Sequence, residues 1–148
     1  MKLKLETTVE QGYLDVKAGF DESLFRKLSP PFPPVKVLRF DGCKKGDWVS
    51  LELNFLLFKQ KWTSEITADH TDDLEFYFID EGVQLPFFLK KWKHKHRVIS
   101  TGIQSKIVDE IEFEAPFSWM NWAMYPLLSL QFAYRKPIYR KIFKRKEN

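Results

Sequence analysis

Apolar and polar side chains alternate with a period of two along most of this chain, and that period constrains its fold more than any other feature. Successive side chains of a β-strand point to opposite faces, so this alternation is typical of strands with one buried face. Short turns at 41–47 and 101–102 join neighbouring segments, which favours sequential antiparallel pairing. The pattern predicts strands over residues 2–9, 35–40, 48–55, 58–68, 74–80, 90–100 and 104–114.

Residues 13–28 lack this alternation, and we expect two short helices there, after the first strand. Asp21 is placed to cap the second of these helices, which would bury Leu24 and Leu28. The four prolines within 30–34 end that helix, because proline lacks the N–H that continues helical hydrogen bonding.

The last stretch of the chain carries apolar residues at helical spacing, on a stripe wider than half of the helix circumference. We expect this helix to begin between residues 123 and 127, with Pro126 in its first turn. Pro137 should kink or divide it. A stripe this wide suits a helix held inside a curved sheet. The predicted fold class is therefore α+β: one domain, 1–148, with a seven-stranded curved antiparallel sheet wrapped around a long C-terminal helix.

Composition limits the classes of protein that the chain can represent. Hydrophobic residues make up 44% of its 148 residues and aromatic residues 16%, which excludes a disordered chain. The single cysteine, Cys43, offers no internal disulfide, and the N-terminus lacks the apolar core of a signal peptide. No apolar stretch reaches the ~20 residues of a membrane-spanning helix. We therefore expect a cytoplasmic protein.

The net charge of +4 belongs to the end of the chain. Seven of the 24 Lys and Arg residues, but only one of the 20 Asp and Glu residues, lie in 135–148, so the remainder is slightly acidic. This distribution argues against a surface that binds nucleic acid and restricts any contact with an anionic membrane or protein to Lys136–Lys146.

The segment from Trp92 to Val98 divides into two chemically different faces. One face carries the basic residues Lys91, Lys93, Lys95 and Arg97, and the following strand carries Glu110, Glu112 and Glu114 at matching spacing. Folding this hairpin about Gly102 sets the two rows against each other. We interpret the lysine-rich run as one half of cross-strand ion pairing on a solvated face.

The opposite, inward face of the same hairpin brings His94, His96 and Asp109 together among apolar residues. Asp109 lies opposite His94 if paired residue numbers sum to 203, and opposite His96 if they sum to 205. Gln60 and Ser64 also point inward by their own alternation. Buried polar groups need hydrogen-bond partners, so each of these side chains is expected to have one.

Three interpretations of the inward histidines stay open. A self-satisfied His–Asp pair would order the core, whereas a pair facing a cavity would contact a ligand. A His-x-His metal site is the third, although the sequence places no further ligand. Phosphate loops, Cys-x-x-Cys pairs and nucleophile elbows are absent, so no cofactor is expected. Cys43 has no neighbouring histidine, which argues against a catalytic thiol.

Several short motifs follow one another in this order of elements: Phe78-Ile79-Asp80, Pro86-Phe87, Trp92-x-His94-x-His96, Asp109 and Phe132-Ala133-Tyr134-Arg135. With that order, the chain resembles the START-like, or SRPBCC, superfamily over nearly its whole length. The resemblance is greatest to uncharacterised bacterial members. It implies a helix-grip fold with a long apolar cavity between the sheet and the last helix, and binding of lipids, sterols, polyketides or similar molecules. Leu85 departs from the glycine that relatives often carry before Pro-Phe, so we expect that loop to differ in shape from theirs.

We therefore predict that the chain carries or senses a hydrophobic small molecule or lipid. The expected lining residues are Phe58, Gln60, Trp62, Phe76, Phe78, Trp92, His94, His96, Asp109, Ile111, Phe113, Leu130 and Tyr134. One alternative is a cyclase, dehydratase or hydrolase in which His94 or His96, oriented by Asp109, moves a proton. Another is a peripheral membrane or partner-docking protein that uses Lys136–Lys146.

Overall fold

The computed structural model describes residues 1–147 of the chain. Its helices are α1 (Tyr13–Ala18), α2 (Glu22–Lys27) and α3 (Ser118–Ile142). Its strands are β1 (Lys2–Val9), β2 (Val35–Phe40), β3 (Trp48–Asn54), β4 (Lys59–Thr71), β5 (Glu75–Gln84), β6 (Lys91–Ser100) and β7 (Ser105–Glu114).

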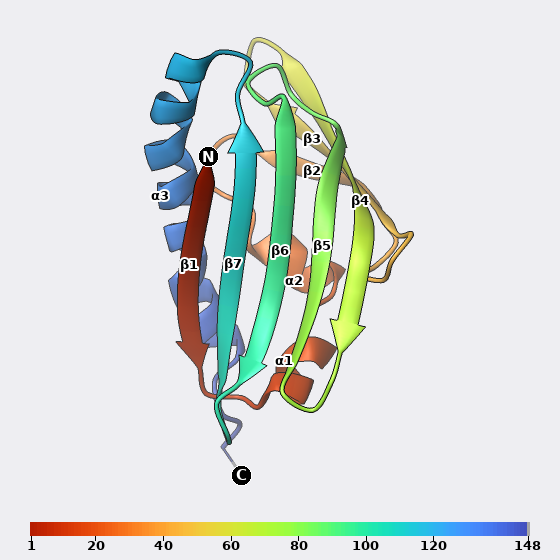
Figure 1. Cartoon of the computed structure of the whole chain (residues 1–148), viewed down its shortest axis with the longest axis vertical. Helices are drawn as coiled ribbons and strands as arrows, with labels where there is room; N and C mark the ends of the chain where they lie inside the picture. The colour runs from red at the N-terminus through yellow and green to blue at the C-terminus, as the bar shows by residue number, and fades with distance from the viewer. Residues whose placement is uncertain (148) are drawn as a thin grey trace.

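All seven strands form one antiparallel sheet in the order β1-β7-β6-β5-β4-β3-β2. The chain meanders from β2 to β7, and β1 then pairs with β7 at the far edge, with Leu5 opposite Asp109. The sheet curves strongly, and α3 crosses its concave side near β1 and β7 (Figure 1). The predicted seven-stranded sheet, its long C-terminal helix and the two short helices after the first strand are confirmed.

One turn and one helix cap form as their residues predict. Gly102 in the β6–β7 turn has a φ of 101°, a conformation that glycine adopts without the clash of a Cβ atom. The Asp21 side chain caps α2 by accepting a hydrogen bond of 2.9 Å from the backbone N–H of Leu24.

The predicted start of α3 was wrong. The helix begins at Ser118, so Pro126 lies in its interior, and Pro137 does not divide it. Each proline removes one bond, to the carbonyl of the residue four places earlier. Those residues, Trp122 and Ala133, are exposed, so water can hydrate the freed carbonyls at little cost.

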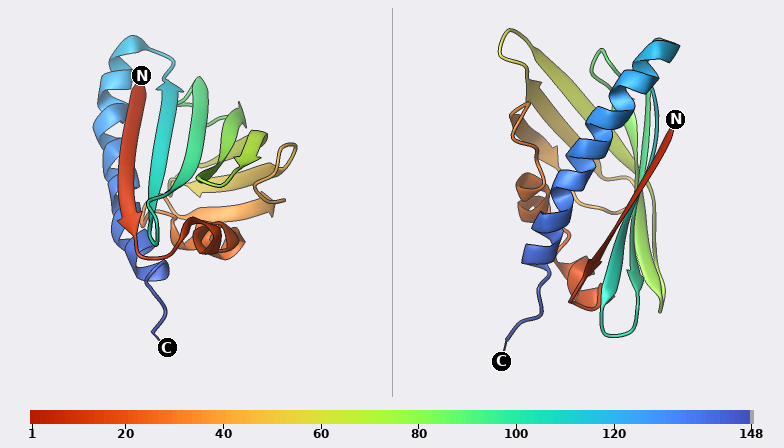
Figure 2. Two further views of the ribbon diagram at one scale, coloured as in Figure 1. Left: turned by 60° about the horizontal axis from the view of Figure 1, so that its bottom comes forward. Right: turned by 90° about the vertical axis from the view of Figure 1, so that its left-hand side faces the viewer.

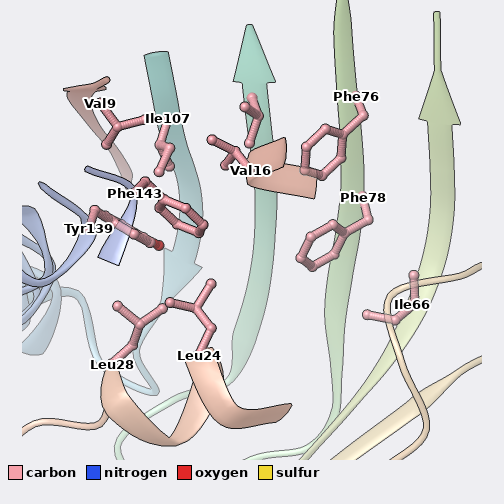
Figure 3. Close-up of a cluster of buried hydrophobic side chains, with 11 residues drawn as sticks. Val9, Val16, Leu24, Leu28, Ile66, Phe76, Phe78, Ile107, Tyr139 and Phe143 are labelled. Carbon is pink, nitrogen blue, oxygen red and sulfur yellow. The ribbon is translucent and has the colours of Figure 1, made fainter. Parts of the chain in front are cut away.

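One core fills the end of the sheet that α1 and α2 cover. It joins Val16, Leu24, Phe78, Tyr139 and Phe143 with neighbouring apolar side chains (Figure 3). These residues come from both short helices, from the sheet and from the last turns of α3, so the core fixes all of those elements together.

A second core attaches the first half of α3 to the other end of the same, concave face of the sheet. Leu128 and Phe132 of the helix pack there with Trp92, Ile111 and Phe113. The contacts of α3 with the sheet are concentrated on β1 and β7. The two views in Figure 2 show the helix standing apart from β2 and β3, so much of the concave face has no helix against it.

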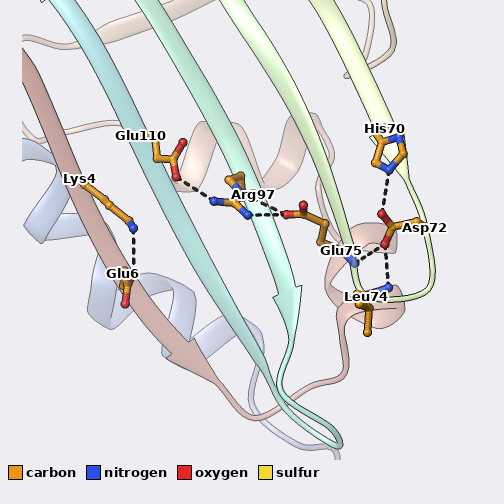
Figure 4. A network of polar contacts seen from close by, with 8 residues as sticks. All are labelled: Lys4, Glu6, His70, Asp72, Leu74, Glu75, Arg97 and Glu110. Atoms are coloured by element: carbon orange, nitrogen blue, oxygen red, sulfur yellow. Dashed lines mark hydrogen bonds and ion pairs between the residues drawn. The ribbon is translucent and has the colours of Figure 1, made fainter.

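The outer face of the β6–β7 hairpin carries the expected opposed charges. Lys91, Lys93 and Lys95 lie opposite Glu114, Glu112 and Glu110. Arg97 makes two ion pairs at this face, to Glu110 and to Glu75 of β5, both at 2.9 Å (Figure 4). The three side chains are only partly exposed, and the pairs link three adjacent strands.

The basic segment predicted to meet anionic partners covers the last turns of α3 and the chain after it. Arg145 is anchored by its backbone N–H, which donates to a Glu10 carboxylate oxygen at 2.7 Å. Contact of this segment with a membrane or protein stays a prediction. Within residues 1–147, no helix is long and apolar enough to cross a membrane.

Candidate functional site

A cavity of about 690 Å³ lies between the concave face of the sheet and α3. Its walls are α2 with the proline-rich segment after it, the inner faces of β2 to β6, and α3. Most of the lining side chains are apolar. Phe32, Leu127 and Leu130 line the cavity and are at least 58% exposed, so it opens between α3 and the proline-rich segment.

Seven of the predicted lining residues border this cavity: Trp62, Phe78, Trp92, His94, His96, Leu130 and Tyr134. The other six lie around it. Phe76 belongs to the first core, and Ile111 and Phe113 belong to the second. Phe58 is partly exposed at the β3–β4 turn, where it stacks on Phe55. Gln60 accepts a hydrogen bond from the backbone of Phe87, and Asp109 is buried behind His94.

The wall of the cavity contains four titratable side chains, Asp80, His94, His96 and Asp109. Nε2 of His94 lies 2.8 Å from Oδ1 of Asp109, and Nε2 of His96 lies 2.6 Å from Oδ2 of Asp80. An ionised carboxylate only accepts, so each imidazole donates from Nε2. Asp80, His94 and His96 border the cavity. Asp109 does not, and it contacts the site through its hydrogen bond with His94.

The two hydrogen bonds run diagonally across the sheet. Asp109 lies directly opposite His96, the register in which the numbers sum to 205, and Asp80 lies opposite His94. Yet each imidazole bonds the carboxylate that is not directly opposite it. The direct neighbours are farther apart: Nδ1 of His94 is 3.6 Å from Asp80, and Nδ1 of His96 is 3.9 Å from Asp109. The two ring centroids are only 3.5 Å apart.

Aromatic rings fix the orientation of both imidazoles. Phe78 stacks on His96 with its centroid 4.3 Å away, and Phe132 meets His94 edge to face at 5.1 Å. The indole N–H of Trp92 donates to the second oxygen of Asp80 at 3.0 Å. The cluster therefore joins the two cores, because Phe78 belongs to the first and Trp92 to the second.

Two residues of α3 that border the cavity also carry buried polar atoms. Among residues 1–147, the hydroxyl of Tyr139 and Nε of Arg135 are buried without a hydrogen-bond partner. Both residues border the cavity. The charge of Arg135 acts on Asp109 and lowers the pKa of that carboxyl. Unpartnered buried polar atoms are uncommon, and these two would gain a partner if a side-chain rotation brought them to a bound molecule.

Burial and neighbouring charges perturb the cluster in opposite ways. Burial lowers the pKa of His94 to about 4, and the adjacent His96 adds to this effect, so His94 is neutral at pH 7. Burial alone would raise the pKa of Asp80 and of Asp109. Hydrogen bonds from His96 and His94, with the imidazole charges, outweigh it and hold both carboxyl pKa values below their ordinary range.

Cys43 also borders the cavity, but it is not a reactive thiol. Burial raises its pKa to about 12, with Asp47 and Asp80 contributing, so the nucleophilic thiolate is scarce at neutral pH. The expectation that Cys43 is not catalytic agrees with this environment.

Three members of this site, Asp80, Arg135 and Tyr139, are not among the predicted lining residues, although Asp80 and Arg135 belong to the motifs that carry the family resemblance. Asp80 had a usable signal, because it shares the alternation of Phe76 and Phe78 and so points inward with them. Asp80, His94 and His96 also supply three potential metal-ligand atoms within 4.8 Å of one another. Nothing in the local pattern distinguishes Arg135 and Tyr139 from the other residues of the helix.

Solved structures share this architecture over nearly the full chain. Norcoclaurine synthase from Thalictrum flavum aligns with a TM-score of 0.69 at 12% identity, covering 97% of this chain and 93% of that one. Protein Ms6760 from Mycobacterium smegmatis aligns at 0.63 and 14%, covering 90% and 84%. An aromatase/cyclase from a Streptomyces species aligns at 0.60 and 12%, covering 93% and 89%.

No protein-family model and no curated protein sequence matches the chain. Identities this low carry no information about activity, because one fold hosts many functions. Strand order, the two short helices and the position of the last helix agree with these neighbours. The chain therefore has the helix-grip fold of these neighbours, the fold that the resemblance noted in its sequence implies.

Proposed function

We propose that the chain binds an apolar small molecule in the cavity, as a carrier or sensor. The observation that carries this proposal is an open, mostly apolar cavity of about 690 Å³ with a few polar groups in its wall. Small-molecule sites in proteins have this size and this composition. The alternative is that the many aromatic residues fill a solid core. A solid core would not contain a cavity this large.

The polar groups suggest what the ligand carries. The hydroxyl of Tyr139 and Nε of Arg135 are buried without partners in residues 1–147, and both border the cavity. A ligand oxygen beside them would satisfy groups that otherwise cost stability. We therefore expect a largely apolar molecule with a hydroxyl or carbonyl group.

Neighbours of the same fold support a ligand of this class. One structure of the Thalictrum flavum norcoclaurine synthase contains dopamine and hydroxybenzaldehyde, which are aromatic molecules with polar substituents. A ligand with about 20 non-hydrogen atoms, each contributing about 0.3 kcal/mol, would bind with about 6 kcal/mol, a Kd in the tens of micromolar.

Titration with the apolar fluorophore Nile red tests the proposal. Leu51 lines the cavity from β3, so Leu51→Trp should fill part of it and weaken binding at least about tenfold. Ser50→Trp is the matched control, because Ser50 is adjacent on the same strand and points to the other face. Equal losses in both variants, or no binding by the wild type, would contradict a ligand cavity.

A second candidate function is acid–base catalysis, of the kind a cyclase or dehydratase needs. The supporting observation is that His96 borders the cavity with Asp80 orienting its ring. His94 is a poor base near neutrality, because its pKa is about 4. A His96→Gln variant that folds and binds Nile red normally but loses a measurable turnover would favour the enzyme.

A further inference from the structure

We propose that Asp80, His94 and His96 bind a divalent transition-metal ion at the cavity wall. The proposal does not depend on an apolar ligand, and the test below uses the metal ion alone. It stands on four observations: the placement of the donor atoms, the groups that hold them, the local charge, and access from the cavity.

The donor atoms converge. Oδ2 of Asp80 lies 2.6 Å from Nε2 of His96 and 3.6 Å from Nδ1 of His94, and the three residues offer donor atoms within 4.8 Å of one another. Bonds of about 2.0–2.2 Å to one ion place tetrahedral ligand atoms a little over 3 Å apart. The two distances from Oδ2 of Asp80 bracket that value, so side-chain shifts of about an ångström would complete the site.

A supporting partner holds each donor residue through another part of its side chain. Asp109 accepts from Nε2 of His94, which leaves Nδ1 of a neutral His94 free to ligate. Trp92 donates to Oδ1 of Asp80, which leaves Oδ2 facing the histidines. Phe78 stacks on the ring of His96. Carboxylate–histidine contacts of this kind are typical of the second layer of residues around protein-bound metals.

The charge at the site favours a cation. Asp80 is largely buried, and apart from the indole N–H of Trp92 the groups that lower its carboxyl pKa are the two imidazoles. The positive charge of Arg135 acts on Asp109 instead. A metal ion would replace the proton between Nε2 of His96 and Asp80. That imidazole proton would then sit on Nδ1, which faces Oδ1 of Asp109 at 3.9 Å.

The donor set selects the class of ion. Two imidazole nitrogens and one carboxylate oxygen suit zinc, cobalt, nickel or iron, whereas calcium and magnesium prefer oxygen donors throughout. All three donor residues border the cavity, so coordination positions on that side stay open. A polar group of a bound molecule could reach an ion held there.

Untagged protein, stripped with a chelator and dialysed, should be titrated with Co²⁺ followed by visible absorption and with Zn²⁺ followed by calorimetry. We expect one ion per chain, with a Kd of about 10 µM or tighter. His96→Gln and Asp80→Asn should each weaken binding at least about tenfold, and Asp109→Asn about 10–100-fold through His94. His70→Gln is the control, because His70 contacts Asp72 in an equally short but exposed pair.

Circular dichroism establishes that each variant is folded. If Asp80→Asn unfolds, zinc-edge absorption spectroscopy of the wild type decides instead, with two imidazole nitrogens and one carboxylate oxygen expected. Absence of binding at about 1 mM metal would overturn the proposal and leave the cluster as a structural His–Asp network. Binding that survives His96→Gln, or is lost in His70→Gln, would also overturn it. Nile red binding by the metal-free protein tests the ligand cavity separately.

Discussion

The stability of this protein should fall between pH 7 and pH 5 because of one residue, His94. Its imidazole is 2% exposed and packs against His96 and Phe132. Burial is the main reason that its pKa is about 4 in the folded chain, against about 6.5 in an unfolded one. Between these values the unfolded chain binds a proton that the folded chain does not, so acid favours unfolding.

The size of the effect follows from those two pKa values. Each pH unit within this window removes about 1.36 kcal/mol, which gives a loss of about 2 kcal/mol between pH 7 and pH 5. The low carboxyl pKa values of Asp80 and Asp109 act in the same direction, but only below about pH 4, where the unfolded carboxyls begin to protonate. The window from 7 to 5 therefore isolates the histidine.

Urea unfolding at both pH values, in chelator so that no metal competes for the imidazole, measures the difference. His94→Gln removes the titrating ring, so its free energy of unfolding should change by about 2 kcal/mol less than that of the wild type. His70→Gln, at an exposed pair with Asp72, should keep the wild-type difference. A wild type equally stable at both pH values, or a His94→Gln variant with the full loss, would refute the reasoning.

Three further substitutions test the cluster by urea unfolding at pH 7. Asp109→Ala leaves the N–H of the neutral His94 buried and unpaired and should cost about 1–3 kcal/mol; an unchanged stability would show that water replaces the carboxylate. Trp92→Phe removes a hydrogen bond to the Asp80 carboxylate and should cost about 2 kcal/mol, and an unchanged midpoint would contradict that bond. Tyr139→Phe deletes a hydroxyl that has no partner in residues 1–147, so stability should hold or rise by about 1 kcal/mol. A clear loss would reveal a partner for that hydroxyl.

Much of the fold was predictable from the chain because the deciding signals are local. The period of two identified all seven strands, and Gly102 and the 41–47 segment marked two of the turns. The helix cap at Asp21 needs contact only with residues of its own first turn. The start of α3 was not predictable from Pro126, because a helix tolerates proline where the freed carbonyl is exposed, and exposure depends on the rest of the fold.

The candidate site was predictable only in part. Alternation placed His94, His96 and Asp109 on one inward face, since side-chain direction along a strand is a local property. It left two registers open, and the observed register sets Asp109 opposite His96, although the hydrogen bond of Asp109 is to His94. The partner of His94 is Asp109 although Asp80 lies opposite, because both bonds run diagonally across the strands.

The sequence by itself determined which residues form strands, which face of each strand is apolar, and that two histidines and a carboxylate share one such face. Only the tertiary structure decided how far α3 lies from β2 and β3. That separation leaves a cavity, although the aromatic content of the chain was equally compatible with a solid core. The tertiary structure also brought Asp80, Arg135 and Tyr139 to that cavity. The physical reason is that periodicity reports the direction of each side chain along its own element, whereas register, sheet curvature and the seating of a helix are set by packing between residues far apart in the chain.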